Sequence, residues 1–320
     1  MFKYQVPKRQ FCVRPFRDFY IGNKGDVYCC CGGGYGKTPI GNLLVSSVEE
    51  IWNGKKIQGI RRDMLYGTAE NDYCKNCPAV VSKTLSNKIP KWLEGVRPEL
   101  QSLPVEVNCG YDRTCNLSCP SCRSCKFVAT SSDLNETEII HKKVEKDLLP
   151  HAKVVYCSGA GDPFVSPFFR NWFRTLKPED MPNLERFSIM TNGEMLTPEM
   201  WESMSQMHSL VKSVAVSMDA ATPETFSVLR RGGHWDRLQK NLRFLATLPV
   251  TVALVFVVQR KNYKEMQEFV EMTKSFNPKW VAKFNVLVNF GTFTDEEFLQ
   301  EAVHLPGHPE HDDYLFCKWM

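Results

Sequence analysis

The sequence of 320 residues has no hydrophobic run long enough to form a membrane-spanning helix. Its longest apolar stretch is Val250 to Val258, whereas a helix needs about 20 apolar residues to cross a bilayer. The opening segment, Met1 to Phe11, is polar and basic and lacks the apolar core of a secretory signal. These absences predict a cytoplasmic protein that does not enter a membrane.

The sequence also lacks a strong charge of either sign. Forty Lys and Arg residues stand against 36 Asp and Glu residues, for a formal net charge of +4. The basic residues form no stripe of the kind that binds nucleic acid, so we expect no nucleic-acid partner. The mild positive balance is compatible with an anionic small molecule. No internal repeat or low-complexity tract interrupts the chain, which has the length of one large domain with a small one.

Cysteine, in contrast, is abundant. The chain has 13 cysteines, and because disulfides are disfavoured in the cytosol, clustered cysteines there indicate metal or redox chemistry. They fall into two groups, with Cys157 and Cys317 apart from both. The first group is Cys12, Cys29, Cys30, Cys31, Cys74 and Cys77, and the second is Cys109, Cys115, Cys119, Cys122 and Cys125.

This distribution divides the chain into three predicted parts. Residues 1–80 form a small α+β domain, with a β-hairpin over Phe19 to Tyr28 and a helix that begins at a capping box, Ser47 to Glu50. Residues 81–102 are polar, rich in lysine and free of cysteine, and are predicted to be a linker. Residues 103–320 form the main domain with a C-terminal tail.

The main domain alternates apolar strands with helices. Runs such as Val252 to Val258 are typical of strands that are buried on both faces of a parallel sheet. Helices begin between the strands, for example at Thr197-Pro198 and Thr222-Pro223, where an N-cap threonine precedes a proline. The predicted strands are Val105 to Cys109, Lys153 to Ser158, Arg186 to Thr191, Ser213 to Met218, Thr251 to Val258 and Val281 to Val288. This order predicts an α/β fold, a partial (βα)6 parallel barrel with its active site on the loops after the strands.

Three cysteines directly after the first of these strands form a C-x3-C-x2-C motif. Thiolates of Cys115, Cys119 and Cys122 can hold three irons of a four-iron cubane and leave the fourth iron open to a ligand. Zinc in a closed structural site normally takes four protein ligands. Cys125 can supply a fourth ligand, so a zinc site remains the alternative at this point.

The motif and the segments after it resemble the radical S-adenosylmethionine (SAM) superfamily. A glycine-rich turn that follows the second strand in that family is matched by Ser158-Gly159-Ala160-Gly161-Asp162-Pro163. The resemblance implies that glycine lets the backbone approach the methionyl amine of SAM and that Asp162 anchors its positive charge. Arg230 is implied to face the methionyl carboxylate, with Arg231 as its competitor. The full set of implied SAM-binding residues is Ala160, Gly161, Asp162, Thr191, Asn192, Ser217, Asp219, Arg230 and Gln259.

The N-terminal cysteines resemble a SPASM or twitch domain, a module that binds auxiliary iron–sulfur clusters. The module usually follows the barrel, whereas here it precedes it. Six cysteines are enough for one cluster with four thiolate ligands. The implied ligands are Cys12, Cys30, Cys74 and Cys77, with Cys31 as the nearest substitute for Cys30. A structural zinc site is again the alternative.

The resemblance implies an enzyme with a 4Fe-4S cluster open at one iron, a second auxiliary 4Fe-4S cluster, and SAM. Cleavage of SAM gives a 5′-deoxyadenosyl radical that removes hydrogen from an unactivated C–H bond. We expect a small-molecule substrate, a sugar or nucleotide-sugar that is oxidised or epimerised, and a flavodoxin- or ferredoxin-type reductant. If the reaction is epimerisation, the candidate hydrogen donors are the thiols of Cys109, Cys125 and Cys157. Modification of a ribosomal peptide is the alternative, and a non-catalytic iron–sulfur or zinc-stapled binding protein is the alternative of another class.

Overall fold

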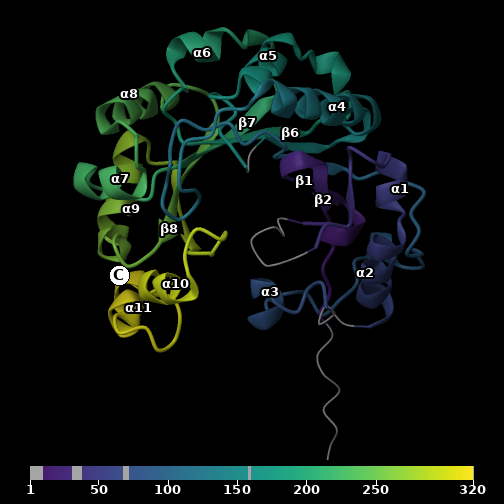
Figure 1. The fold of residues 1–320 in the computed structure, drawn as a ribbon, viewed down its shortest axis with the longest axis horizontal. Coiled ribbons are helices and arrows are strands. Elements are labelled where there is room, and N and C mark those ends of the chain that lie inside the picture. Colours follow the sequence, from purple (N-terminus) through teal and green to yellow (C-terminus); the bar gives the residue numbers. More distant parts are fainter. Residues whose placement is uncertain (1–9, 31–37, 68–71, 158–159, 320) are drawn as a thin grey trace, which may run out of the picture.

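A single curved sheet runs through the protein. The computed structural model describes residues 10–30, 38–67, 72–157 and 160–319. Within them, a nine-stranded sheet has the order β3-β2-β1-β4-β5-β6-β7-β8-β9, and the helices lie around the outer side of its arc (Figure 1). In the same residues no helix has the length and apolarity needed to cross a membrane.

Strands β4 to β9 form the parallel part of the sheet, because each neighbouring pair among them runs in the same direction. Their bounds are β4 Glu106–Cys109, β5 Val154–Cys157, β6 Arg186–Thr191, β7 Val211–Ser217, β8 Thr251–Val258 and β9 Val281–Val286. β6 and β8 have the predicted bounds, and the other four differ only at their ends. The predicted α/β fold with a partial parallel barrel is therefore confirmed.

Two of the helices that follow these strands begin at the predicted N-cap threonines. The hydroxyl of Thr197 accepts from the N–H of Met200 at 3.2 Å, and the hydroxyl of Thr222 accepts from the N–H of Thr225 at 3.4 Å. The helices are α4 Ser131–Asp147, α5 Pro167–Thr175, α6 Pro198–Glu202, α7 Pro223–Leu229, α8 Trp235–Leu245, α9 Met266–Phe276, α10 Asp295–Glu301 and α11 His311–Trp319. Short 3-10 turns are η1 Arg14–Phe16, η2 Asn23–Gly25, η4 Lys91–Leu93, η5 Leu149–His151, η6 Pro178–Asp180, η7 Ser205–Met207 and η8 Tyr263–Glu265.

The N-terminal region is built onto the same sheet. Strands β1 (Asp18–Ile21) and β2 (Asp26–Tyr28) form the predicted hairpin, and β1 also pairs in parallel with β4. β3 (Gly41–Asn42) lies at the edge, followed by α1 Val48–Trp52, α2 Lys55–Tyr66 and α3 Pro78–Val81. The capping box at Ser47 and Glu50 is present. The cysteine-rich region is thus fixed to the first strand of the barrel, while the domain boundaries at residues 80 and 102 stay a prediction.

The predicted linker, residues 81–102, packs along the helices α1 and α2. The indole N–H of Trp52 donates to the carbonyl of Ser102 at 2.8 Å. The side chain of Asn53 donates to the carbonyl of Leu100 at 2.8 Å and accepts from its N–H at 2.9 Å. The end of this segment is therefore held by reciprocal hydrogen bonds to the N-terminal region.

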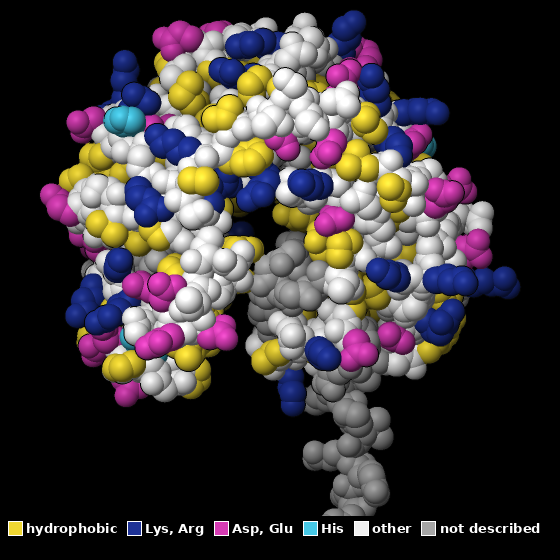
Figure 2. Space-filling view, viewed as in Figure 1, with side chains coloured by type: hydrophobic (Ala, Val, Ile, Leu, Met, Phe, Trp, Pro, Cys, Tyr) yellow, Lys and Arg dark blue, Asp and Glu magenta, His cyan; other side chains and the backbone are white. Residues whose placement is uncertain are grey.

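The two faces of the parallel sheet differ in chemistry. On the helix-covered face, strands bury large apolar side chains such as Phe187 and Leu254, both 0% exposed. On the concave face, β6 and β8 carry larger side chains at Met190 and Val255, but many of the side chains are short. The short ones on β6, β7 and β8 are Ser188, Ser213, Ala215, Ser217 and Ala253. Branched apolar residues fill the interior of a closed barrel, so this composition leaves the concave face hollow. Figure 2 shows the molecule hollowed at its centre, with Lys and Arg side chains gathered at the inner rim.

His141 of α4 generates the first testable prediction. Its Nδ1 lies 2.7 Å from the hydroxyl of Tyr111, and its ring packs edge-on against Trp172. Burial lowers the pKa of His141 to about 4, whereas an unfolded histidine has a pKa of about 6.5. The unfolded chain therefore binds more protons between these values, and stability that is present above about pH 6.5 is lost as the pH falls toward 4.

We expect the free energy of unfolding to fall by about 2 kcal/mol between pH 6.5 and 5 through this group. Urea unfolding of the wild type and of a His141→Gln variant at both pH values measures the difference. The variant should lose less stability over the interval, and the two proteins should change in parallel between pH 7 and 8. Equal losses from pH 6.5 to 5 would contradict the assignment.

Candidate active site

The C-x3-C-x2-C motif lies on the loop between β4 and α4. The loop closes on itself, because the N–H of Cys115 donates to the carbonyl of Phe127 at 2.9 Å and the reverse bond is 3.3 Å. A tight turn follows, in which the N–H groups of Cys122 and Arg123 donate to the carbonyl of Cys119 at 2.9 and 3.0 Å. The fold therefore presents the three predicted cluster thiols on one closed loop.

Two of these thiols receive N–H donors, one from the end of β6 and one from the end of α7. Nη1 of Arg230 lies 3.7 Å from Sγ of Cys119, and Nδ2 of Asn192 lies 3.8 Å from Sγ of Cys115. Burial raises the pKa of both thiols, and the charge of Arg230 opposes this for Cys119. Donors of this kind stabilise thiolates and orient metal ligands. The predicted residues Asn192 and Arg230 thus converge on the cysteine loop.

Arg230 is held in place by a buried ion pair. Its Nη2 lies 2.8 Å from Oδ2 of Asp219, which follows β7. Asp219 has a φ of +60°, a conformation that costs free energy in a residue other than glycine and often marks a functional site. Its Oδ1 accepts from the N–H of Val257 at 2.7 Å. Nε of Arg230 is buried without a hydrogen-bond partner among the residues that the structure describes, so it remains available to a bound acceptor.

Asp162 is fully engaged inside the protein. Its Oδ2 accepts from the hydroxyl of Thr191 at 2.8 Å and from the N–H of Asn192 at 2.6 Å, and its Oδ1 accepts from the N–H of Phe164 at 3.0 Å. Its own N–H donates to the carbonyl of Thr114 at 2.8 Å. Burial raises the pKa of Asp162, and these hydrogen bonds oppose the rise. This geometry favours a role in positioning, and direct contact with the methionyl amine stays a prediction.

Gly161 is required by a close approach between two backbones. A Cβ on this residue would lie 2.5 Å from the carbonyl oxygen of Thr114 and 2.6 Å from that of Asp112. The guanidinium of Arg123 donates to the carbonyl of Ala160 in the same turn. Ala160 and Gly161 therefore contact the segment that leads into the cysteine loop. Ser158 and Gly159, the first residues of the predicted turn, lie outside the described residues.

The remaining predicted residues lie on the same edge of the sheet. Ser217 is the last residue of β7 and is in register with Val255 of β8. Gln259 follows β8 directly and is buried, with its N–H donating to Oδ1 of Asn262 at 2.8 Å. The side chain of Asn262 in turn donates to the carbonyl of Asp219 at 2.9 Å. The polar ends of β7 and β8 are thus tied together.

The predicted hydrogen donors lie in two different environments. Cys109 and Cys157 are in register on β4 and β5, and both are 0% exposed. They share the helix-covered face with Val107 and Val155, and burial raises the pKa of Cys109 to about 12. This placement directs both thiols away from the concave face and argues against a role as donors. Cys125 is exposed beside the cysteine loop and stays the candidate.

The N-terminal cysteines gather at one end of the hairpin. The pKa of Cys12 is raised by burial and further by the nearby Cys30. Cys29 lies close enough to Cys30 for a side-chain hydrogen bond and feels the charge of Cys74. Cys74 begins the turn in which the N–H of Cys77 donates to its carbonyl at 2.8 Å. Cys29, which the sequence interpretation passed over, therefore lies among the predicted auxiliary ligands. Cys31 lies outside the described residues.

The donor set of the central loop fits an open iron–sulfur cluster. The loop supplies three thiols, and side-chain N–H groups of Asn192 and Arg230 point at two of them. Nε of Arg230 is buried beside them and has no partner among the described residues.

A second buried carboxylate, Asp112, was not predicted. Its Oδ1 accepts from the N–H and from the hydroxyl of Thr114, both at 2.7 Å, and the hydroxyl of Ser166 donates to its Oδ2. The sequence signal was the short Asp-x-Thr spacing, which is typical of a side chain that bonds a nearby backbone N–H. Asp112 therefore fixes the backbone just before the cysteine loop and ties it to the start of α5.

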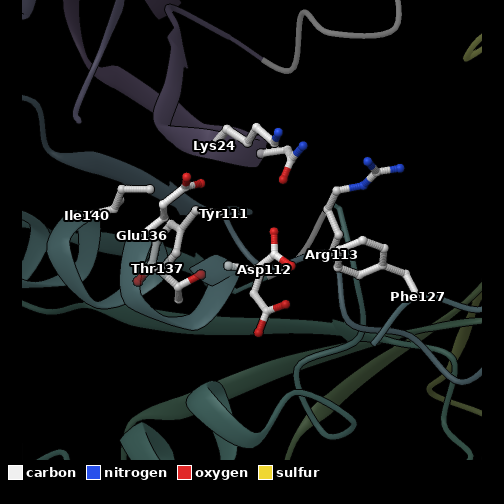
Figure 3. A pocket seen from close by; sticks show the side chains of 10 residues that line it. Lys24, Tyr111, Asp112, Arg113, Phe127, Glu136, Thr137 and Ile140 are labelled. Carbon is white, nitrogen blue, oxygen red and sulfur yellow. The ribbon is translucent and has the colours of Figure 1, made fainter. Parts of the chain in front are cut away.

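Asp112 and Arg113 also border a small pocket between the hairpin and α4 (Figure 3). Lys24 reaches it from η2, and Glu136 and Thr137 from α4. Its volume of about 10 Å³ holds at most a single water. The pocket is therefore a small packing gap between the N-terminal region and the barrel, and it is too small to hold a ligand.

Comparison with known families gives two matches. A model of an iron–sulfur cluster-binding domain, SPASM, matches residues 12–78. A model of the radical SAM superfamily matches residues 112–273, a segment that begins just before the cysteine loop and ends in α9. The two predicted modules are therefore found in the predicted order.

Two curated relatives match part of the chain. One is the tungsten-containing aldehyde ferredoxin oxidoreductase cofactor-modifying protein of Pyrococcus furiosus, 26% identical over 161 residues, which are 48% of this chain and 44% of the relative. The other is the mycofactocin maturase MftC of Mycobacterium tuberculosis, 25% identical over 194 residues, which are 60% of this chain and 47% of the relative. The matched part thus spans about half the length of each relative.

Solved structures resemble the chain loosely. Streptococcus suis SuiB bound to precursor peptide SuiA has a TM-score of 0.43 and 14% identity, and the match covers 85% of this chain and 62% of that chain. The radical SAM methyltransferase TsrM of Kitasatospora setae, with cobalamin and a 4Fe-4S cluster bound, has a TM-score of 0.41 and 11% identity, with 60% and 39% covered.

The buried carboxylate of Asp162 generates a prediction about the cysteine loop. An Asp162→Asn substitution replaces one acceptor oxygen by an NH2 group among groups that donate to it. We expect a loss of about 2–4 kcal/mol in the free energy of unfolding, together with a lower iron content after anaerobic reconstitution. Asp63→Asn, at an exposed position of α2, is the matched control. A variant with the stability and iron content of the wild type would show that Asp162 does not position the loop.

Proposed function

The chain belongs to the radical SAM superfamily, and from this premise we propose that it modifies a peptide by removing hydrogen from an unactivated C–H bond. The observation that carries the proposal is the similarity over 194 residues to a relative named as a maturase. A second relative is named for modification of a cofactor. Neither name points to a sugar. The N-terminal SPASM domain supports the same choice, since such domains accompany peptide modification in the family that the sequence resembles.

The cofactors of this enzyme follow from its two modules. A radical SAM domain uses a 4Fe-4S cluster and SAM, and the SPASM domain adds an auxiliary cluster. In our proposal Cys115, Cys119 and Cys122 hold the first cluster, and Cys12, Cys30, Cys74 and Cys77 hold the second. When bound, the first cluster and SAM supply the radical that abstracts hydrogen, so the protein has to position the reactants and exclude competing reactions.

The chain's own residues account for that positioning. Arg230 is oriented by Asp219, and its free Nε can donate to a carboxylate such as that of the methionyl group. Asp162 and Asp112 fix the backbone at Thr114, directly before the cysteine loop. The concave face leaves room for a substrate, with a cavity at the strand ends opposite these groups. Whether the peptide is oxidised or epimerised depends on the fate of the substrate radical, and an exposed Cys125 suits a donor of hydrogen.

Loss of one cluster thiol tests the central assignment. In anaerobic, reconstituted protein with dithionite and SAM, Cys119→Ala should reduce 5′-deoxyadenosine to the background of a reaction without enzyme. Cys317→Ala, at a half-buried position of α11, should retain the wild-type amount. Deoxyadenosine formed by Cys119→Ala at the wild-type rate would refute the cluster assignment. Peptides encoded beside the gene should show a SAM-dependent mass change with the wild type and none with Cys119→Ala.

The auxiliary centre is tested separately by iron analysis. The wild type should bind about eight irons per chain, as expected for two 4Fe-4S clusters. Cys74→Ala should lower this number to about four and leave the SAM-cleaving cluster in place, which electron paramagnetic resonance of the reduced protein can verify. An unchanged iron content in Cys74→Ala would mean that this residue is not an auxiliary ligand.

A further inference from the structure

A cavity of about 230 Å³ opens on the concave face of the sheet. Its walls come from β5 to β9 and combine short side chains such as Ser188 and Ala215 with longer ones such as Met190. Arg186 and Thr251, which also line it, are the first residues of β6 and β8. The candidate active site lies beyond the opposite ends of these strands. The cavity is therefore in the part of the barrel that is remote from the cysteine loop.

The charged side chains that line this cavity are both cations. Among the described residues that form its wall, Arg186 and Lys283 carry charge and no carboxylate is present. Arg186 is oriented by Tyr156, because Nη2 donates to the tyrosine hydroxyl at 2.7 Å and the guanidinium lies 5.6 Å from the ring centroid. The side chain of Lys283 is exposed and makes no hydrogen bond or ion pair with any residue that the structure describes. Two such cations in a recess attract an anionic group.

The acidic groups near the cavity are already paired elsewhere. Glu185, next to Arg186 in the chain, lies 3.0 Å from the ammonium of Lys153. Glu106, on the concave face of β4, forms an ion pair with Arg17. A purely structural role for Arg186 would be served by pairing with such a carboxylate. Instead, Arg186 lines the cavity as an exposed side chain, and among the described residues its guanidinium bonds Tyr156 and no carboxylate.

The distance between the cavity and the active site restricts the ligand. From Arg186 to Thr191, β6 rises by roughly 16 Å, at about 3.3 Å per residue. An extended peptide covers that length with about five residues, whereas a single sugar ring does not reach across it. A substrate held at both ends therefore has to be extended, as a peptide of about five residues is.

We propose that Arg186, Lys283 and Tyr156 form a subsite for a carboxylate of the substrate, with the two cations as ligands and Tyr156 as the residue that orients Arg186. The proposal rests on peptide modification as the function and adds the chemistry by which the peptide is recognised. The carboxylate belongs to an acidic side chain or to the C-terminus of the peptide. It anchors the peptide on the concave face while the residue to be modified lies at the cysteine loop.

The test uses the anaerobic holoenzyme and defined probes. These are N-acetylated Gly-Ser-Ala-Ala-Glu amide, the Gln counterpart as an amide, and the Gln counterpart with a free C-terminal carboxylate. Glutarate serves as a carboxylate without a peptide chain. Binding is measured by ligand-observed NMR titration to the wild type, Arg186→Gln, Lys283→Gln and Tyr156→Phe. Lys279→Gln, which removes an exposed cation outside the cavity, is the matched control.

We expect at least one acid-bearing peptide to bind about tenfold more tightly than the Gln amide, which corresponds to one charge-assisted contact. The preference should disappear in Arg186→Gln, weaken in Lys283→Gln and Tyr156→Phe, and persist in Lys279→Gln. A stronger effect on the Glu peptide identifies a side-chain carboxylate, and a stronger effect on the free C-terminus identifies a terminal one.

Two outcomes separate this proposal from the proposed function. If peptides bind equally well with and without the carboxylate, or if the preference survives in both Arg186→Gln and Lys283→Gln, the subsite is refuted while peptide modification stands. If glutarate binds in a manner that depends on Arg186 but none of the acid-bearing peptides binds, the carboxylate site is not a peptide subsite and the proposal is refuted, while the SAM-dependent mass change of encoded peptides tests the proposed function separately.

Discussion

The buried carboxylate of Asp162 is the interaction on which the candidate active site depends. It joins the turn after β5 to Thr191 and Asn192 at the end of β6, while its own N–H holds Thr114 ahead of the cysteine loop. A buried carboxylate is tolerated only when its oxygens are satisfied by donors. The hydrogen bonds that offset the cost of burying Asp162 therefore also fix the ends of β5 and β6 relative to one another. Asn192, held in this way, directs its side-chain NH2 group at Sγ of Cys115.

A similar chain of polar contacts places Arg230 on the other side of the site. Glu265, in the turn after β8, accepts from the N–H of Ala221 at 2.7 Å and from the hydroxyl of Thr222 at 3.1 Å, and so it holds the start of α7. α7 is only seven residues long and ends directly before Arg230. The position of the guanidinium is thus set from one end by Glu265 and from the other by Asp219. On both sides of the site, the residues that approach the cysteine loop are thus positioned by carboxylates that accept hydrogen bonds: Asp162 on one side, and Asp219 and Glu265 on the other.

Much of this arrangement follows from local patterns in the sequence. The apolar run of β8 and the capped start of α7 are local, and both were predicted correctly. The polar residues after β6 and β7 meet because parallel strands end at the same edge. The pairing of β1 with β4 joins residues more than eighty positions apart, and no local pattern specifies it. The hydrogen bonds of the Asp162 carboxylate come from its own turn and from the end of β6, and the sequence did not predict these partners. The contact with the methionyl amine that the family resemblance implies stays a prediction.

Cys109 shows where a local pattern was present and its consequence was missed. Along β4 the residues alternate between half-buried and buried, which puts Cys109 on the same face as Val107. The sequence could therefore group these two side chains. It could not tell which face of the sheet would be open, because that depends on where the helices pack. The helices cover the face of Cys109, and the open face belongs to Asn108 and Tyr156.

The hollow concave face has a cost in stability, and the helix-covered face offsets it. Short side chains such as Ser188 and Ala215 bury little apolar area, at about 25 cal/mol for each Å². Opposite them, aromatic residues of α5 pack on β6, with the rings of Trp172 and Phe173 lying 5.8 and 6.1 Å from that of Phe187. Aromatic side chains supply the largest buried areas of any residue type. The apolar packing that stabilises these strands is therefore concentrated on the helix-covered face, and the short side chains of the concave face contribute little to it.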